Sequence, residues 1–445
     1  MIRRPRGRLR TAAAVLAIGA ISASLTACGG GGSSSGAVDP KARTTITWWT
    51  GQADQAETLL EGLAADYEKL HPNVTVKVSS GAPSTEDLLA KLSASFAGGN
   101  YPDISYAFGS WASQLEASNR TLDITKQVAD PDVDWKGLSG AARATAQPTG
   151  KKTIGFPALV DNISLLYNTK LFAQAGVSAP TDDWTWDDFR AAAKKLTDPS
   201  KSTYGMAMEG GSYTEGVHFA YIFGKQHGAD PFDSSGKPDF TSDGMVAGVK
   251  QYVDLMGTNK VVNPSSAQYK NGPEAPGDFA KGKAAMLMSQ NNADNTLQAD
   301  GMKSSEYGVV PIPSGGDSDT ASFVAGINLS IFKNTKNPTG AMKFVKFMTS
   351  KDTQATLDKP FTALPVVKGG TVNFTDSKTE ADAFQSVLNE RAEPLPLVPA
   401  EAAYETNVGN AVNALVAQAA TGKPVTDADI KAALKEAEDK MASAG

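Results

Sequence analysis

Side chains able to carry out covalent or metal chemistry are scarce in this sequence. Its 445 residues contain three histidines, His71, His218 and His227, and one cysteine, Cys28. Neither a His-Glu-x-x-His motif nor a Cys-x-x-Cys pair occurs, so no metal site is indicated. Residues 32–36 read Gly-Ser-Ser-Ser-Gly and match the nucleophile-elbow pattern, but they lie in a Gly/Ser run where no strand-to-helix turn can form. We therefore expect no catalytic residue, no cofactor and no metal.

The single cysteine follows a segment with the features of an export signal. Five arginines up to Arg10 form a basic region, and residues 12–24 form an apolar stretch too short to span a bilayer. Leu25-Thr-Ala-Cys28 resembles the bacterial lipobox, whose cysteine thiol accepts a lipid. A signal peptide with a chance cysteine, and twin-arginine export, are the weaker alternatives. We expect residues 1–27 to be a cleaved signal peptide and residues 28–43 to be a lipidated cysteine with a flexible linker, which would hold the protein on the outer side of the cell membrane.

Charge excludes one class of partner. The formal net charge is −6, and removal of the five arginines in residues 1–27 would make it −11. Without a basic field, binding to nucleic acid or electrostatic docking on anionic lipid is not expected. The apolar content of 41% with 8% aromatic residues is typical of a globular chain. No second apolar run of membrane-spanning length occurs, so the lipid is expected to be the membrane attachment.

Strand and helix patterns alternate along the rest of the chain. Residues 44–49 are β-branched and aromatic, apolar residues recur at helical spacing over 56–70, and residues 74–78 alternate as a second strand. Strand, helix, strand is the unit of a parallel or mixed α/β sheet. Two capping boxes, Thr185-x-x-Asp188 and Thr426-x-x-Asp429, predict the starts of later helices. Further strands are predicted at 163–167, 309–313 and 328–332, and a helix through 341–348.

Several local motifs, in order, resemble the family-1 extracellular solute-binding proteins, the maltose-binding-protein-like group. The strongest block is Lys152-Thr-Ile-Gly-Phe-Pro157, then Asp161, then Leu166-Tyr-Asn-Thr-Lys-Leu-Phe172 and Trp186-Asp-Asp-Phe189. Other matches are Tyr101-Pro-Asp-Ile104, residues 279–286, 323–328, 338–349, 363–366 and 421–434. The resemblance covers nearly all of the chain after the linker, and its order and spacing are more specific than any single motif.

The resemblance implies an α/β, two-lobed periplasmic-binding-protein-like fold of type II with several hinge crossings. On that pattern, lobe 1 would comprise 44–158 plus 308–358, and lobe 2 would comprise 159–307 plus 359–445. Crossings would fall near Pro157–Ala158, Tyr307–Gly308 and Lys359–Pro360. A ligand would lie in the cleft between the lobes.

The same resemblance implies a set of ligand-binding residues on loops after strand ends. They are Trp49, Gln52, Phe108, Trp111, Asp161, Tyr213, Asn291, Asn292, Gly326, Asn328 and Phe361. Aromatic rings with amides and carboxylates suit a sugar, which has apolar C–H faces and a rim of hydroxyls.

Some of these residues could instead have a purely structural role. Trp48 and Trp49 alternate across a strand, and we expect Trp48 to point into the core and Trp49 toward the cleft. Asp161 could instead cap a backbone turn, and Asn291 and Asn292 could be turn residues. Gln290-Asn-Asn292 stands where many members of the family carry a Gly-x-Trp aromatic. The resemblance therefore supplies no stacking ring at this position and does not identify the sugar.

Taken as an expectation, the resemblance indicates a carbohydrate-binding receptor that delivers its ligand to the permease subunits of an ABC importer. It would act as a monomer and would not be an enzyme. A receptor for a peptide, polyamine or metal chelate is the alternative within the binding class. A secreted two-carboxylate glycosidase is a more distant one, because the separation of carboxylates in space cannot be read from the sequence.

Overall fold

The computed structural model describes residues 43–444 except 53, 83–84, 132, 271 and 316–317. The predicted signal peptide, Cys28 and nearly all of the linker lie outside the described residues. Within those ranges, no helix combines the length and apolarity needed to cross a membrane.

The first lobe is built on three parallel strands in the order β2-β1-β3. Their bounds are Thr44–Trp49 for β1, Val74–Ser79 for β2 and Ile104–Phe108 for β3. Helix α1, Asp54–Leu70, connects β1 to β2, as the strand-helix-strand pattern predicts. The alternation of β1 places Trp48 in the core, fully buried, with its ring centroid 5.1 Å from that of Tyr106. The prediction for Trp48 is therefore confirmed.

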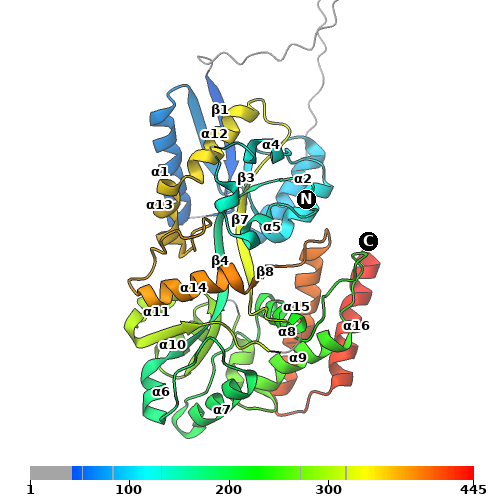
Figure 1. Cartoon of the computed structure of the whole chain (residues 1–445). Coiled ribbons are helices and arrows are strands. Elements are labelled where there is room, and N and C mark those ends of the chain that lie inside the picture. The colour runs from blue at the N-terminus through cyan, green and yellow to red at the C-terminus, as the bar shows by residue number, and fades with distance from the viewer. Residues whose placement is uncertain are drawn as a thin grey trace, which may run out of the picture. The chain divides into compact units, whose positions relative to one another are not determined.

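Two long antiparallel strands, β4 (Phe156–Asn168) and β7 (Ser322–Ile331), connect the lobes (Figure 1). The C-terminal half of β7 pairs with β3, and the N-terminal half of β4 pairs with β7. The other half of β4 pairs with β5 (Met286–Gln290) and β6 (Tyr307–Val310) in the second lobe. A short strand, β8 (Ala392–Pro394), lies parallel to the start of β7. One hydrogen-bonded sheet thus runs through both lobes.

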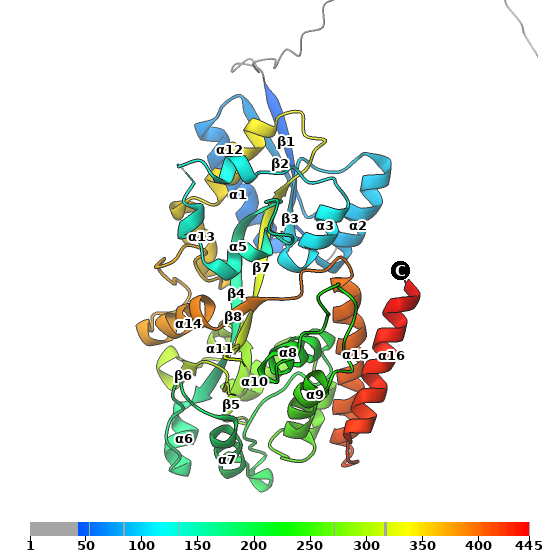
Figure 2. The ribbon, with the colours of Figure 1, turned by 45° about the vertical axis from the view of Figure 1, so that its right-hand side comes forward.

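Helices cover this sheet on both lobes. Besides α1, the helices that lie with the first lobe are α2 (Thr85–Gly98), α3 (Ala112–Ala117), α4 (Thr125–Val128), α5 (Gly140–Thr145), α12 (Pro338–Met348) and α13 (Lys351–Phe361). The others are α6 (Thr169–Ala175), α7 (Trp186–Leu196), α8 (Tyr213–Gln226), α9 (Asp243–Met256), α10 (Glu274–Ala280), α11 (Ala293–Ala299), α14 (Lys378–Glu390), α15 (Glu401–Ala420) and α16 (Asp427–Ala444). Short 3₁₀ turns are η1 (Gly109–Trp111), η2 (Trp135–Gly137), η3 (Pro199–Lys201), η4 (Pro264–Gln268) and η5 (Ser304–Glu306). Figure 2 shows α8, α9, α15 and α16 side by side in the second lobe.

Both predicted capping boxes are present. The Thr185 hydroxyl accepts from the Asp188 N–H, and the Asp188 carboxylate accepts from the Thr185 N–H at 3.0 Å. Thr426 and Asp429 make the same reciprocal bonds at the start of α16. These bonds satisfy backbone donors that have no partner within the helix, so each helix begins where its local sequence indicates.

The packing of β6 differs from the predicted lobe ranges. Although β6 follows the predicted crossing at Tyr307–Gly308, it pairs with the second-lobe half of β4. Val310, Ile312 and Phe323 are buried in the second core, around Phe219 and Tyr404. The polypeptide therefore returns to the first lobe within β7. Elsewhere the lobe ranges remain a prediction.

Candidate functional site

A cavity of about 460 Å³ lies where β4 and β7 pass between the lobes. The first lobe contributes Leu89 of α2, the end of β3, the turn η1 and Thr145 of α5. The second contributes the N-terminal parts of α8 and α15 and residues at the ends of β5 and β8. Residues 323–327, in the N-terminal half of β7, and residues 159–161 of β4 complete the wall. Every face of the cavity therefore comes from segments that are far apart in the sequence.

Two aromatic side chains form the first-lobe wall. Phe108 ends β3 in an extended conformation, and the chain turns at once into η1, which carries Trp111. The two ring centroids are 5.0 Å apart with an interplanar angle of 58°. A side chain at Gly109 would collide with Thr145, so this turn requires glycine to let η1 lie against α5. Both aromatic residues line the cavity.

The opposing wall is the start of α8. Ser212 caps the helix by accepting from the Glu215 N–H at 3.2 Å, which places Tyr213 and Thr214 in the first turn at the cavity. His218 lines the cavity one turn later, with its ring centroid 4.1 Å from that of Phe323. Burial lowers the pKa of His218 to about 3, so the ring is neutral at physiological pH.

Asp161 is the polar group of β4 that faces the cavity. Its backbone pairs with Ala325 of β7, and its side chain lies in the wall. Among the described residues, no hydrogen-bond donor reaches its buried Oδ1 atom. Burial raises the pKa of Asp161 from its ordinary 3.8 to about 7. A buried carboxylate oxygen without a donor is costly, and a ligand hydroxyl or amine in the cavity would satisfy it.

A second carboxylate reaches the cavity from α15. Glu405 and Thr406 line it together with Ala402. Glu401, one turn earlier, is 1% exposed, and burial followed by the negative charge of Glu405 raises the pKa of Glu401 well above its usual value. Of this pair, Glu405 is the acid that lines the cavity.

Seven of the predicted residues line this one cavity: Phe108, Trp111, Asp161, Tyr213, Asn292, Gly326 and Phe361. Sequence reasoning missed His218, Phe323, Thr214, Gln290 and Glu405, which also line it. The four-residue spacing of Thr214 and His218 on one helix was the available signal for His218. Nothing local indicated Glu405.

The other four predicted residues, Trp49, Gln52, Asn291 and Asn328, are not among those that line this cavity. Trp49 packs against a small first-lobe cluster that also includes Trp111, with the Lys91 Nζ atom 4.7 Å from its ring centroid. Gln52 follows a turn in which its backbone N–H donates to the Thr50 hydroxyl at 3.2 Å.

The two asparagines of this group have structural bonds. Asn291 is 1% exposed, accepts from the Asn162 N–H at 3.1 Å and donates to the Thr362 carbonyl oxygen. Asn328 is also buried and donates to the Thr145 carbonyl oxygen at 3.1 Å. Their amides connect backbone segments and have no face on the cavity wall.

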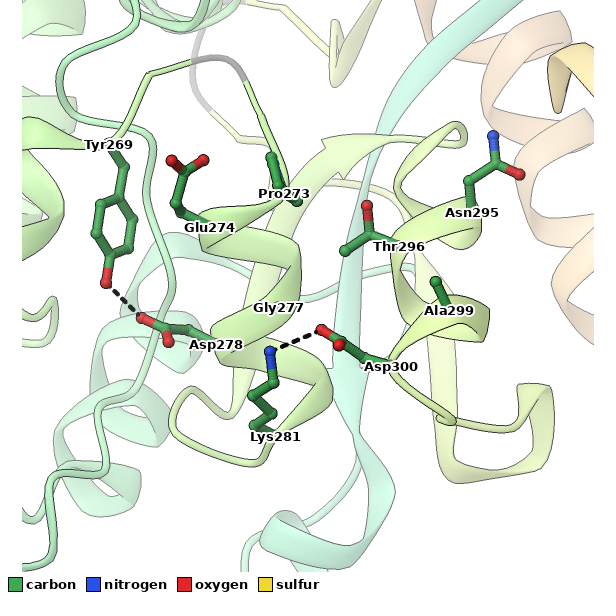
Figure 3. A pocket seen from close by; sticks show the side chains of 10 residues that line it. All are labelled: Tyr269, Pro273, Glu274, Gly277, Asp278, Lys281, Asn295, Thr296, Ala299 and Asp300. Atoms are coloured by element: carbon green, nitrogen blue, oxygen red, sulfur yellow. Dashed lines mark hydrogen bonds and ion pairs between the residues drawn. The ribbon is translucent and has the colours of Figure 1, made fainter. Parts of the chain in front are cut away.

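A second hollow, of about 600 Å³, lies between α10 and α11 (Figure 3). Two of its three acids, Asp278 and Asp300, have partners within the described residues. Tyr269 donates its hydroxyl to Asp278 at 2.9 Å, and the Lys281 ammonium lies 2.9 Å from the Asp300 carboxylate. The hollow lies in the second lobe alone and brings together none of the predicted residues. We assign it no function. Within the described ranges, no cluster of three or more His, Cys, Asp or Glu side chains could hold a metal ion.

The fold and the cavity together define a two-lobed solute-binding protein. Residues 51–355 match the bacterial extracellular solute-binding protein family, and the chain belongs to that family of binding proteins. Its fold is similar to that of the sugar-binding protein MalE from Xanthomonas citri, with a TM-score of 0.76 and 18% identity over 90% of this chain and 98% of that one. It is also similar to an ABC substrate-binding protein of Listeria monocytogenes in complex with cycloalternan, with a TM-score of 0.71 and 23% identity over 90% and 99% of the two chains. The galactooligosaccharide-binding protein of Bacillus subtilis is 25% identical over 435 residues, which cover 94% of this chain and 93% of that protein.

Proposed function

We propose that the protein is the carbohydrate-binding receptor of an ABC importer and that it binds a sugar or short oligosaccharide in the cavity between its lobes. The observation that carries this proposal is the Asp161 carboxylate, whose Oδ1 atom has no donor among the described residues and which shares the cavity with five aromatic residues, Phe108, Trp111, Tyr213, Phe323 and Phe361. Aromatic rings stack on the C–H faces of a sugar, while a carboxylate accepts from its hydroxyls. The carbohydrate-binding proteins to which this chain is similar, such as MalE and the galactooligosaccharide-binding protein, also support the proposal.

Binding would couple to closure of the lobes. The cavity wall combines η1 of the first lobe with α8 and α15 of the second, so a ligand that contacts all three stabilises the closed arrangement more than an open one. Such a ligand shifts the hinge equilibrium by the difference between its affinities for the two states. The closed monomer would then deliver its ligand to the permease subunits in the membrane.

We further propose that lipidated Cys28 holds the receptor at the outer face of the membrane. In cells that express the full chain, the parent protein should partition into detergent phase and incorporate labelled fatty acid. A Cys28→Ser variant should do neither and should be released. Equal partitioning of both proteins would refute the anchor without affecting the assignment of the cavity.

A calorimetric and thermal-shift screen of the purified residues 43–445 tests the function. The panel contains neutral mono- and oligosaccharides, free amino acids, a short peptide, spermidine and a ferric chelate. Saturable binding of a carbohydrate, with an increase in melting temperature, is expected, because a ligand that binds only the folded state stabilises it. Binding of spermidine, peptide or chelate without any saccharide would refute the proposal. Release of new reducing ends from oligosaccharides during incubation would instead indicate a glycosidase.

A further inference from the structure

The described cavity lining holds acids but no basic side chain that is charged at physiological pH. Asp161 on β4 and Glu405 on α15 are the acids that line it, and among the described lining residues there is neither a lysine nor an arginine. The one histidine in the wall, His218, is buried against Phe323 and neutral at physiological pH. The described lining therefore holds an acid on each of two walls and no cationic side chain.

No cation among the described residues stabilises the ionised form of Asp161. Burial alone raises its pKa to about 7, so a cationic ligand would be needed to hold the carboxylate fully ionised at neutral pH. Such a carboxylate gains most from a partner that supplies both a hydrogen-bond donor and a positive charge, because charge-assisted hydrogen bonds are roughly twice as strong as neutral ones. An anionic group in the same place would meet like charge in a poorly screened site.

The aromatic wall accepts the same kind of group. Phe108 and Trp111 present tilted rings 5.0 Å apart, and Tyr213 lies at the start of α8 on the other lobe. The face of an aromatic ring attracts an ammonium group and also packs on the C–H face of a sugar ring. A saccharide bearing an amine could use the rings and the carboxylates together.

We propose that the cavity selects saccharides that carry a protonated amine over neutral saccharides of the same ring, and that it excludes acidic ones. This inference rests on the proposed carbohydrate function and narrows its substrate class. The Asp161 carboxylate is the residue that determines the preference, with the negative charge of Glu405 adding to it.

Matched sets of ligands test the inference. Glucose, galactose and mannose are each compared, by calorimetry at neutral pH, with the corresponding 2-amino sugar and uronic acid, and the β-1,4-linked disaccharides of glucose and of glucosamine extend the series. We expect the amino member to bind about tenfold tighter than the neutral member of its set, and the uronic acid not to bind. Equal affinity of amino and neutral members, or a preference for the uronic acid, would overturn the inference and leave the carbohydrate function intact. If no saccharide of any charge binds in this series or in the earlier screen, the carbohydrate function itself fails.

Two variants separate a charge effect from a shape effect. Asp161→Asn keeps the size of the side chain but removes its charge, so the ratio of amino to neutral affinity should fall close to one. Asp182→Asn removes an exposed charge on the loop before α7 and should keep the full ratio. An unchanged ratio in Asp161→Asn would assign the preference to something other than this carboxylate and would refute its role.

Discussion

Replacing Asp161 with asparagine should stabilise the empty protein while it weakens ligand binding. In the folded protein, burial raises the pKa of Asp161 from 3.8 to about 7, and its Oδ1 atom has no donor among the described residues. The folded state therefore holds the Asp161 proton more tightly than the unfolded chain does. Between these two pKa values the folded state binds more protons, so stability from this group falls as pH rises through that window.

The size of the effect follows from the shift. Each pKa unit corresponds to about 1.4 kcal/mol, so a shift of about three units costs the charged form at most about 4 kcal/mol of unfolding free energy. Below the pKa of the unfolded chain, Asp161 is protonated in both the folded and the unfolded protein, so burial of the charge costs nothing. Asparagine is neutral at every pH, so the variant has no such cost at high pH. The variant should thus match the parent near pH 4 and exceed its stability above pH 7.

Chemical unfolding of ligand-free parent and Asp161→Asn protein across this pH range measures the effect. The difference in unfolding free energy should grow between pH 4 and pH 7 and then level off. Asp182→Asn, an exposed acid in the same lobe, should show no comparable rise. A pH-independent difference for Asp161→Asn, or a variant less stable than the parent at high pH, would show that Asp161 is not a buried, unpartnered carboxylate.

Three other substitutions probe the walls and the framework. Tyr213→Ala should weaken carbohydrate binding by at least about tenfold with little change in melting temperature, because its ring is half-buried at the cavity; calorimetry and thermal melts check both. Thr185→Ala removes the capping box of α7 and should lower the unfolding free energy by about 1 kcal/mol, measured by denaturant titration, with ligand affinity unchanged. Gly409→Ala places a methyl group against the Tyr213 carbonyl oxygen, so α8 and α15 must separate; we expect a loss of about 2 kcal/mol and weaker binding, and an unchanged denaturation midpoint would contradict this packing.

Much of the local structure could be predicted because it depends on near neighbours. The alternation of β1 indicated that Trp48 is buried, and the capping boxes at Thr185 and Thr426 located the starts of two helices. The ends of strands were predicted less well. Strand β6 covers residues 307–310 rather than 309–313, and β7 begins at Ser322 rather than at residue 328. A long strand that serves two lobes is buried on both faces, so it lacks the alternation that would mark its ends.

The membership of the cavity was only partly predictable. Gly326 and Asn328 are two residues apart on β7, yet Gly326 lines the cavity while Asn328 is covered by α5 and bonded to Thr145. Whether a given residue of a strand faces the cavity or is covered by a helix depends on where the helix ends. The sequence of the strand does not contain that information. For the same reason, Asn291 was predicted at the cavity but is buried and accepts a hydrogen bond from the backbone of Asn162.

The order of strands and helices, their caps and the resemblance to a family of binding proteins can all be predicted from the sequence, because these depend on residue periodicity and on contacts a few positions apart. Which side chains share the cavity depends instead on how distant segments pack. His218 and Glu405 meet there because α8 packs against α15, with glycines at 216 and 409 allowing close approach of the two backbones. Burial of Asp161 likewise arises from segments distant in sequence. Desolvation is set by everything that surrounds a group in space, and this is why the charge selectivity of the cavity could be inferred only from the folded chain.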